Sequence, residues 1–166
     1  MIKIGIDVGS TTAKLVAVDE NDNLLFSKYE RHNAKAKETI LSFLKELLSE
    51  IGDKDISVRI TGSIGMGISE KCSLPFVQEV VAAAKAIQKD YSHVTSMIDI
   101  GGEDAKVVFF KDAEATDLRM NGNCAGGTGA FIDQMAIILG VNIDELNQLA
   151  MNATQVYPIA LSLIHI

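Results

Sequence analysis

Apolar and polar residues alternate at the start of the chain in the pattern of a β-hairpin. Apolar residues occupy every second position from Ile2 to Asp7, and a second β-rich run spans Ala13 to Val18. The segment between them, Gly9 to Thr12, has the composition of a turn. The sequence therefore predicts two antiparallel strands joined at a polar tip.

The rest of the pattern predicts a mixture of strands and helices. Strands are expected over residues 24–29, 56–61, 95–100, 106–110 and 115–120, and helices over residues 34–51, 78–89, 128–139 and 144–151. The strand over 95–100 is expected to be buried. Asn121 or Asn123 is expected to cap the third helix. In the first helix the predicted buried face comprises Ile40, Leu44, Leu47, Leu48 and Ile51, with Gly52 at the end.

The chain contains an internal repeat. Residues 7–14, DVGSTTAK, match residues 99–106, DIGGEDAK, in register, with an offset of 92 residues from Asp7 to Asp99. Each copy has an apolar strand, an acidic residue, a glycine-containing turn and a second apolar strand. Two such hairpins predict duplicated lobes that face each other.

A boundary between the lobes is expected between Gly62 and Gln78. There a glycine-rich segment, Gly62 to Gly67, precedes a Leu-Pro break. Its three glycines suit a close backbone approach or a hinge. The prediction is an α/β fold with a first lobe over residues 1–70 and a second over residues 71–166.

Composition excludes several classes of protein. The 166 residues are 48% hydrophobic, enough for a globular core, and carry a net charge of −7. That charge argues against nucleic-acid binding, which needs clustered Lys and Arg. No apolar run approaches the ~18 residues of a membrane span, so no membrane association is expected and a cytoplasmic location is the default.

The two predicted hairpins suit a polyphosphate. Glycine, serine and threonine in a turn offer N–H groups and hydroxyls to phosphate oxygens, and an Asp at a strand end can hold hydrated Mg²⁺. An isolated Asp in such a turn would be an ordinary turn carboxylate, but the repeat favours the phosphate interpretation. Glu103 and Asp104 are further carboxylates: either one of them, with Glu103 as the candidate, orients an attacking water, or both are solvated turn residues. The other candidates are Asp7 and Asp99 for the metal, and Gly9, Ser10, Thr11, Thr12, Lys14, Gly101 and Gly102 for the phosphates.

The stretch MNGNCAGGTGAF, residues 120–131, places a cysteine in a glycine-rich turn that opens a helix. A helix N-terminus favours a thiolate, so Cys124 is a candidate metal or cluster ligand. A single cysteine is equally often a small buried residue, and this stretch alone leaves both interpretations open. The backbone N–H groups expected to approach an anion here are those of Gly126, Gly127, Thr128 and Gly129.

The remaining cysteine and the histidines form no recognisable site. Cys72 is expected to be a structural or free thiol, since neither cysteine belongs to a CxxC pair. The three histidines show no ligand spacing and are expected at the surface; they are His32, His93 and His165.

The segments IGIDVGSTTAK and IDIGGEDAK resemble the two phosphate motifs of the acetokinase, sugar kinase, Hsp70 and actin superfamily. TGSIGMG resembles the segment that leaves its first lobe. Within that superfamily, LPFVQEVVAAAKA and NGNCAGGTGAFIDQMA resemble the CoA-substrate-specific enzyme activases. This group contains the activators of 2-hydroxyacyl-CoA dehydratases and the ATPase subunits of benzoyl-CoA reductase. The match extends to about Pro158 and implies two RNase H-like lobes.

The resemblance also implies an activity. It implies a homodimer that holds one [4Fe–4S] cluster between its subunits and couples hydrolysis of ATP, with Mg²⁺, to delivery of one low-potential electron. The implied acceptor is a 2-hydroxyacyl-CoA dehydratase or a benzoyl-CoA reductase, and the implied electron donor is ferredoxin or flavodoxin. In that family each subunit gives two cysteines; Cys124 matches the first, and Cys72 does not match the second.

The chain departs from the family pattern in three places. The segment after YPIA lacks the second cysteine, and no adenosine-binding motif occurs before Ile166. The chain therefore resembles a truncated activase with an incomplete second lobe, foreign final residues and a weakly held cluster, and it is expected to be inactive by itself. Glu103 stands where stand-alone activators have Gln, which favours the larger multidomain activases.

Two other classes of function stay open. An N-acetylhexosamine-type kinase of the same fold would need a sugar-binding segment and a catalytic Asp between the lobes, and neither is identified. A nucleotide-dependent scaffold would need no redox chemistry. The motif around Cys124 separates the activase from both.

Overall fold

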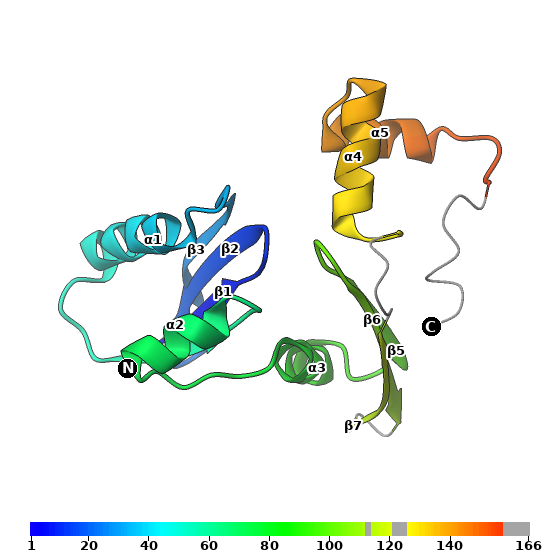
Figure 1. The fold of residues 1–166 in the computed structure, drawn as a ribbon. Helices are drawn as coiled ribbons and strands as arrows, with labels where there is room; N and C mark the ends of the chain where they lie inside the picture. Colours follow the sequence, from blue (N-terminus) through cyan, green and yellow to red (C-terminus); the bar gives the residue numbers. More distant parts are fainter. Residues whose placement is uncertain (112–113, 121–125, 158–166) are drawn as a thin grey trace. The chain divides into compact units, whose positions relative to one another are not determined.

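The computed structural model describes residues 1–111, 114–120 and 126–157, and it separates into two compact units (Figure 1). The first unit is Met1–Lys85 and the second is Ala86–Ile166. Each contains one sheet, so the chain has the mixed α/β architecture expected from its sequence. The lobe boundary between residues 70 and 71 stays a prediction about the organisation of the ATPase lobes.

The first unit is a four-stranded sheet with helices. Its strands are β1 (Ile2–Val8), β2 (Thr12–Val18), β3 (Leu24–Arg31) and β4 (Ile56–Thr61), in the order β3-β2-β1-β4. The first three strands are antiparallel neighbours, whereas β4 is parallel to β1. A parallel neighbour needs a crossover, and helix α1 (Ala36–Ile51) lies in that connection. Helix α2 (Gly65–Cys72) follows β4.

The core of the first unit lies between the sheet and α1. Every second residue of β1 is buried, from Ile2 to Val8, which confirms the predicted alternation. The buried residues of α1 are Ile40, Phe43, Leu47 and Ile51, with Leu44 partly buried against the core. The assignment of Leu48 to this face was wrong, since its side chain is 57% exposed. Leu48 lies roughly 80° around the helix from Ile40, at the edge of the buried stripe.

Two local features of this unit differ from the sequence expectation. Helix α1 begins at Ala36 rather than residue 34, because Asn33 and Ala34 have positive φ angles of 46° and 62°. The second half of the glycine-rich segment 62–67, where no helix was predicted, forms the start of α2. Glycine has a low helix propensity, so a helix as short as α2 that contains two glycines was not predicted from the sequence.

The second unit contains a three-stranded antiparallel sheet and the C-terminal helices. Its strands are β5 (Ser96–Ile100), β6 (Ala105–Lys111) and β7 (Glu114–Met120), in that order. Helix α3 (Glu79–Asp90), which contains the boundary between the two units, precedes them, and α4 (Gly129–Leu139) and α5 (Ile143–Met151) follow. Asn142 caps α5 in a reciprocal capping box with Glu145. In the described part of the chain no helix has the length and apolar character to cross a membrane.

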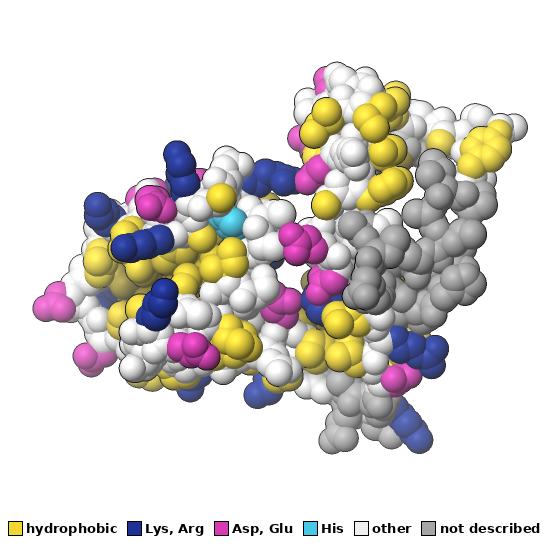
Figure 2. All heavy atoms as spheres, in the orientation of Figure 1, with side chains coloured by type: hydrophobic (Ala, Val, Ile, Leu, Met, Phe, Trp, Pro, Cys, Tyr) yellow, Lys and Arg dark blue, Asp and Glu magenta, His cyan; other side chains and the backbone are white. Residues whose placement is uncertain are grey.

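The second unit corrects two expectations. Strand β5 was expected to be buried, but it is an edge strand, and its face that carries Ile98 is uncovered: Ile98 is 66% exposed. Thr128, not Asn121 or Asn123, occupies the N-cap position of α4. Figure 2 shows hydrophobic side chains gathered over α4 and α5. The exposed apolar residues of these helices are Ile132, Ile137, Ile138, Leu139, Ile143, Leu149 and Met151.

Two neighbouring leucines of α1 give a test of the core. Leu47 is 1% exposed, and Leu47→Ala should destabilise the first unit by about 2–5 kcal/mol because it leaves a cavity. The control Leu48→Ala removes the same atoms from the surface and should change stability by no more than about 0.5 kcal/mol. The measurement is urea unfolding followed through amide NMR signals of β1 to β4. Equal costs at the two positions would contradict the assigned helix face.

Candidate functional site

The first hairpin gathers the sequence-predicted residues of the first repeat. Asp7 pairs with Lys14 across β1 and β2, and the Lys14 ammonium lies 2.9 Å from Asp7 Oδ2. The Gly9 N–H donates to the Thr12 carbonyl at 3.0 Å and closes the turn. Because Ile6 and Val8 face the core, Asp7 lies on the opposite face of the sheet. Both charged side chains are partly solvated, so their ion pair adds little stability.

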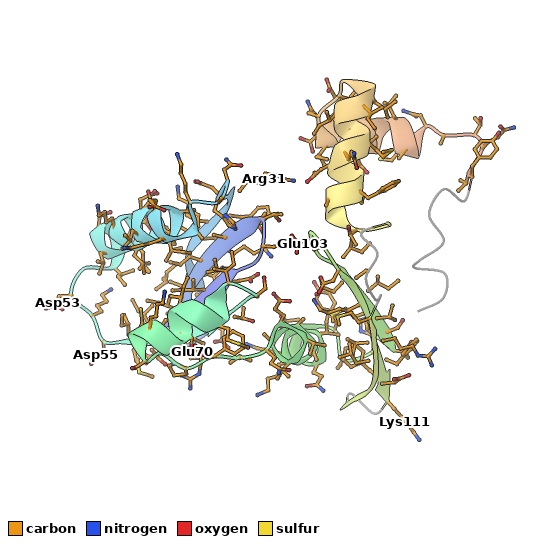
Figure 3. The ribbon with its side chains drawn as sticks, in the orientation of Figure 1. Arg31, Asp53, Asp55, Glu70, Glu103 and Lys111 are labelled. Atoms are coloured by element: carbon orange, nitrogen blue, oxygen red, sulfur yellow. The ribbon has the colours of Figure 1, made fainter. Side chains whose placement is uncertain are left out.

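The second hairpin repeats the strand pairing and the turn hydrogen bond of the first, but its lysine pairs with a different carboxylate. Asp99 pairs with Lys106 across β5 and β6, and the Gly101 N–H donates to the Asp104 carbonyl at 2.8 Å. The nearly buried Lys106 ammonium lies 2.8 Å from Asp104 Oδ2. Glu103 is exposed in the turn between these strands (Figure 3). The same closing hydrogen bond therefore occurs at matching positions of both repeats.

Helix α4 is attached to the second turn by its first backbone amides. The Gly129 N–H donates to the Gly101 carbonyl at 2.8 Å, and the Ala130 N–H donates to the Gly102 carbonyl at 2.9 Å. A Cβ on Gly129 would lie 3.0 Å from the Gly101 oxygen, so glycine suits this close approach. The N–H of Gly129 is thus already donated, and its predicted role as an anion donor was wrong.

The segment before α4 holds the other predicted phosphate residues. Gly126 and Gly127 are partly buried, and Thr128 is fully buried at the helix N-cap. Cys124, the predicted cluster ligand, lies outside the described residues. Cys72 is an exposed free thiol at the end of α2, in agreement with the sequence interpretation.

The end of β4 lies against the end of β1. Thr61 pairs in parallel register with Asp7, and its Oγ1 is buried without a hydrogen-bond partner in the described part of the chain. The N–H of Ile64 donates to the Val8 carbonyl at 2.9 Å. Gly62 has a φ of +96°, and an added Cβ would lie 2.3 Å from the Val8 oxygen, so the predicted close backbone approach is confirmed. The Thr-Gly pair directly after a strand could have drawn attention to Thr61.

His32 is the functional candidate that sequence reasoning missed. It was expected at the surface, but it is only 3% exposed. Its Nε2 lies 3.0 Å from the Gly9 carbonyl oxygen, and its backbone N–H donates to the Thr11 carbonyl at 3.2 Å. His32 therefore contacts the turn of the first hairpin through both its side chain and its backbone. Among the described residues, no group of three or more His, Cys, Asp or Glu side chains is arranged to hold a metal ion.

The fold has counterparts among solved ATPase structures. The activator of 2-hydroxyisocaproyl-CoA dehydratase from Clostridium difficile, solved with bound ADPNP, superimposes with a TM-score of 0.81 at 29% identity over 95% of this chain. Component A of the (R)-2-hydroxyglutaryl-CoA dehydratase of Acidaminococcus fermentans gives the same TM-score at 28% identity, also over 95% of this chain. These similarities support the predicted actin, Hsp70 and sugar kinase class of fold.

The sequence pattern of the BadF/BadG/BcrA/BcrD ATPase family matches residues 4–163, and the chain belongs to this family. A curated relative, the 2-hydroxyisocaproyl-CoA dehydratase activator of Clostridioides difficile, is 31% identical over 92% of this chain. The chain covers 58% of that relative and 59% and 61% of the two solved proteins. The resemblance deduced from the motifs is thereby confirmed.

Two glycines near the end of β4 test the close approach to β1. Gly62→Ala should destabilise the first unit by about 2 kcal/mol or more, because the methyl group meets the Val8 backbone and φ is unfavourable. The control Gly67→Ala lies in helix α2 with open space around its Cβ and should stabilise by roughly 0.5–1 kcal/mol. Urea unfolding of both variants measures the difference. A tolerated Gly62→Ala would disprove the close contact.

Proposed function

We propose that this chain carries the phosphate-binding hairpins of an ATP-hydrolysing activator that delivers a low-potential electron to a CoA-ester enzyme. The observation that carries the proposal is the duplicated turn, in which Gly9 and Gly101 make the same closing hydrogen bond. A glycine-containing turn of this kind suits a phosphate group, because its backbone N–H groups can donate to phosphate oxygens. The bound ADPNP of the similar Clostridium difficile activator supports a nucleoside triphosphate as the ligand.

The proposed roles follow the chemistry of each side chain. Glycine amides and the hydroxyls of the first turn donate to phosphate oxygens, and the proposed set is Gly9, Ser10, Thr11, Thr12, Gly101, Gly102, Gly126, Gly127 and Thr128. Asp7 and Asp99, at matching strand ends, have the carboxylate chemistry that suits Mg²⁺ through its waters. When bound, the metal neutralises charge that develops on the phosphates. Lys14, which forms an ion pair with Asp7, is proposed to contribute its charge to phosphate binding, and Glu103 is proposed to orient the attacking water.

The proposed electron carrier is a [4Fe–4S] cluster on a dimer axis, with Cys124 of each subunit as a ligand. Cysteine thiolates are the usual ligands of such clusters. The support from the structure is the attachment of α4 to the Gly101 and Gly102 carbonyls, since α4 directly follows the segment that contains Cys124. A shift of this turn on nucleotide binding would move α4 and hence the surroundings of the thiolate. The potential of the cluster would then depend on the nucleotide.

The proposed partners come from the relatives. The similar proteins named above are an activator of one 2-hydroxyacyl-CoA dehydratase and a component of another. We therefore propose a dehydratase of this class, or a related enzyme such as benzoyl-CoA reductase, as the electron acceptor. Ferredoxin or flavodoxin is the proposed donor, and the cytoplasm is the proposed location.

Asp7 provides the test of the nucleotide proposal. Asp7→Asn nearly preserves the shape of the side chain but removes its charge, so MgATP hydrolysis by the intact gene product should fall by about a hundredfold or more. Asp53→Asn, in the exposed loop between α1 and β4 (Figure 3), makes the same charge change away from the turn. Its hydrolysis rate should equal that of the wild type. Unchanged turnover in Asp7→Asn would refute the metal role.

The two cysteines provide the test of the cluster proposal. After anaerobic reconstitution, iron and sulfide bound to the protein should be lost in Cys124→Ser, because serine replaces the thiolate ligand. Cys72→Ser removes the exposed thiol and should keep the metal content of the wild type. We expect the 166-residue chain to hold the cluster weakly, because two subunits supply only two matching thiolates. Retention in Cys124→Ser, or loss in Cys72→Ser, would contradict the assignment.

A further inference from the structure

The contacts of His32 control the direction in which the peptide groups of the first turn point. The carbonyl oxygens of Gly9 and Thr11 both accept hydrogen bonds from His32. All described peptide bonds are trans, and in a trans peptide the carbonyl oxygen and the N–H point in opposite directions. The N–H groups of Ser10 and Thr12 therefore point away from His32. The carbonyl oxygens thus lie on the side of the turn that faces His32, and the N–H groups of Ser10 and Thr12 point to the other side.

The hydrogen bond that Nε2 of His32 donates, rather than the space that the ring fills, explains why a histidine is found at this position. A carbonyl oxygen only accepts, so the ring hydrogen must be on Nε2. The other nitrogen, Nδ1, is buried and has no hydrogen-bond partner among the described residues. An unpaired buried polar atom destabilises a fold, and an apolar side chain would fill the same space without that cost.

The backbone after His32 adds a second indication that its position is enforced. Asn33 and Ala34 are consecutive residues with left-handed φ angles, a conformation that is unfavourable for alanine. The Lys35 N–H donates to the His32 carbonyl at 2.7 Å and closes this reversal. The chain accepts local strain where it places the imidazole against the turn.

The second repeat holds the matching carbonyl in the same way with a different donor. Gly101 corresponds to Gly9 in the repeat, and its carbonyl accepts from the Gly129 N–H of α4 instead of from an imidazole. The next carbonyl of that turn, from Gly102, accepts from Ala130. The matching carbonyl oxygen of each turn, from Gly9 or Gly101, thus accepts from a donor that lies later in the same unit. A requirement shared by two different local structures points to the same kind of ligand, a phosphate group, at each turn.

We infer that His32 is a positioning residue for phosphate binding. It holds the Gly9 and Thr11 oxygens away from a bound polyphosphate and leaves the Ser10 and Thr12 amides to face it. A carbonyl that rotated toward the phosphates would repel them, whereas an N–H group attracts them. The inference rests on the proposed nucleotide function, and its experiment separates the two.

The test compares two replacements of His32 with inorganic tripolyphosphate and Mg²⁺ as the probe. His32→Gln places an amide N–H near the position of Nε2, whereas His32→Phe keeps a flat ring without a donor. Binding is measured by amide NMR titration of the whole chain, with Ser10 as the reporter. We expect His32→Phe to weaken binding about tenfold and His32→Gln to stay within about threefold of the wild type. His93→Gln, at an exposed histidine, is the control and should bind as the wild type does.

Each outcome has a defined meaning. Equal binding by His32→Phe and wild type, or equal weakening by Gln and Phe in folded variants, would overturn the positioning role but leave the nucleotide proposal intact. A wild-type chain whose Ser10 amide does not respond to the probe would overturn both. If His32→Phe fails to fold, the ¹⁵N signals of the His32 ring in the wild type decide: hydrogen on Nε2 supports the inference and hydrogen on Nδ1 refutes it.

Discussion

The alternation of buried and exposed residues in β1 determines the face of the sheet on which Asp7 lies, just before the turn that the Gly9 amide closes. Burying Ile6 and Val8 in the core forces Asp7 to the opposite face of the sheet, because successive side chains of a strand alternate. A register slip of one residue would bury Asp7 and expose the apolar residues. The hydrophobic core therefore fixes which face of β1 carries Asp7, and the parallel pairing with β4 brings Thr61 to the same face and the same end.

The two repeats have the same hairpin but differ in what surrounds it. Ile98 and Ile100 of β5 correspond to Ile6 and Val8 of β1. The residues of β1 are buried, whereas Ile98 is 66% exposed and Ile100 is 48% exposed. In the first unit β4 pairs with the outer side of β1, and among the described residues of the second unit no strand pairs with that side of β5. The apolar composition of β5 is that of a central strand, which is why the sequence predicted burial.

The structure was predicted correctly from the sequence where a short, regular pattern of residues determines it. The alternation in β1 and β2 and the repeated hairpin depend on local patterns that few other structures produce. The burial of His32 was missed because it depends on two left-handed residues after β3 and on a turn more than twenty positions earlier, and neither contact leaves a periodic signal. Helix α2 was missed because its glycines have a low helix propensity. Phe43 was missed because the buried face of α1 is wider than the set of positions predicted to be buried.

The different donors to the two turns have a mechanical consequence. In the first unit the Gly9 oxygen is tied to a side chain at the end of β3, so that contact connects two parts of one sheet. In the second unit the matching oxygen of Gly101 is tied to the first turn of α4, a rigid element with its own connection to α5. Movement of the second turn would therefore be transmitted along a helix, while movement of the first would be resisted by the sheet. Of the two matching turns, the second is the better placed to convert occupancy of the proposed phosphate site into a displacement elsewhere in its unit.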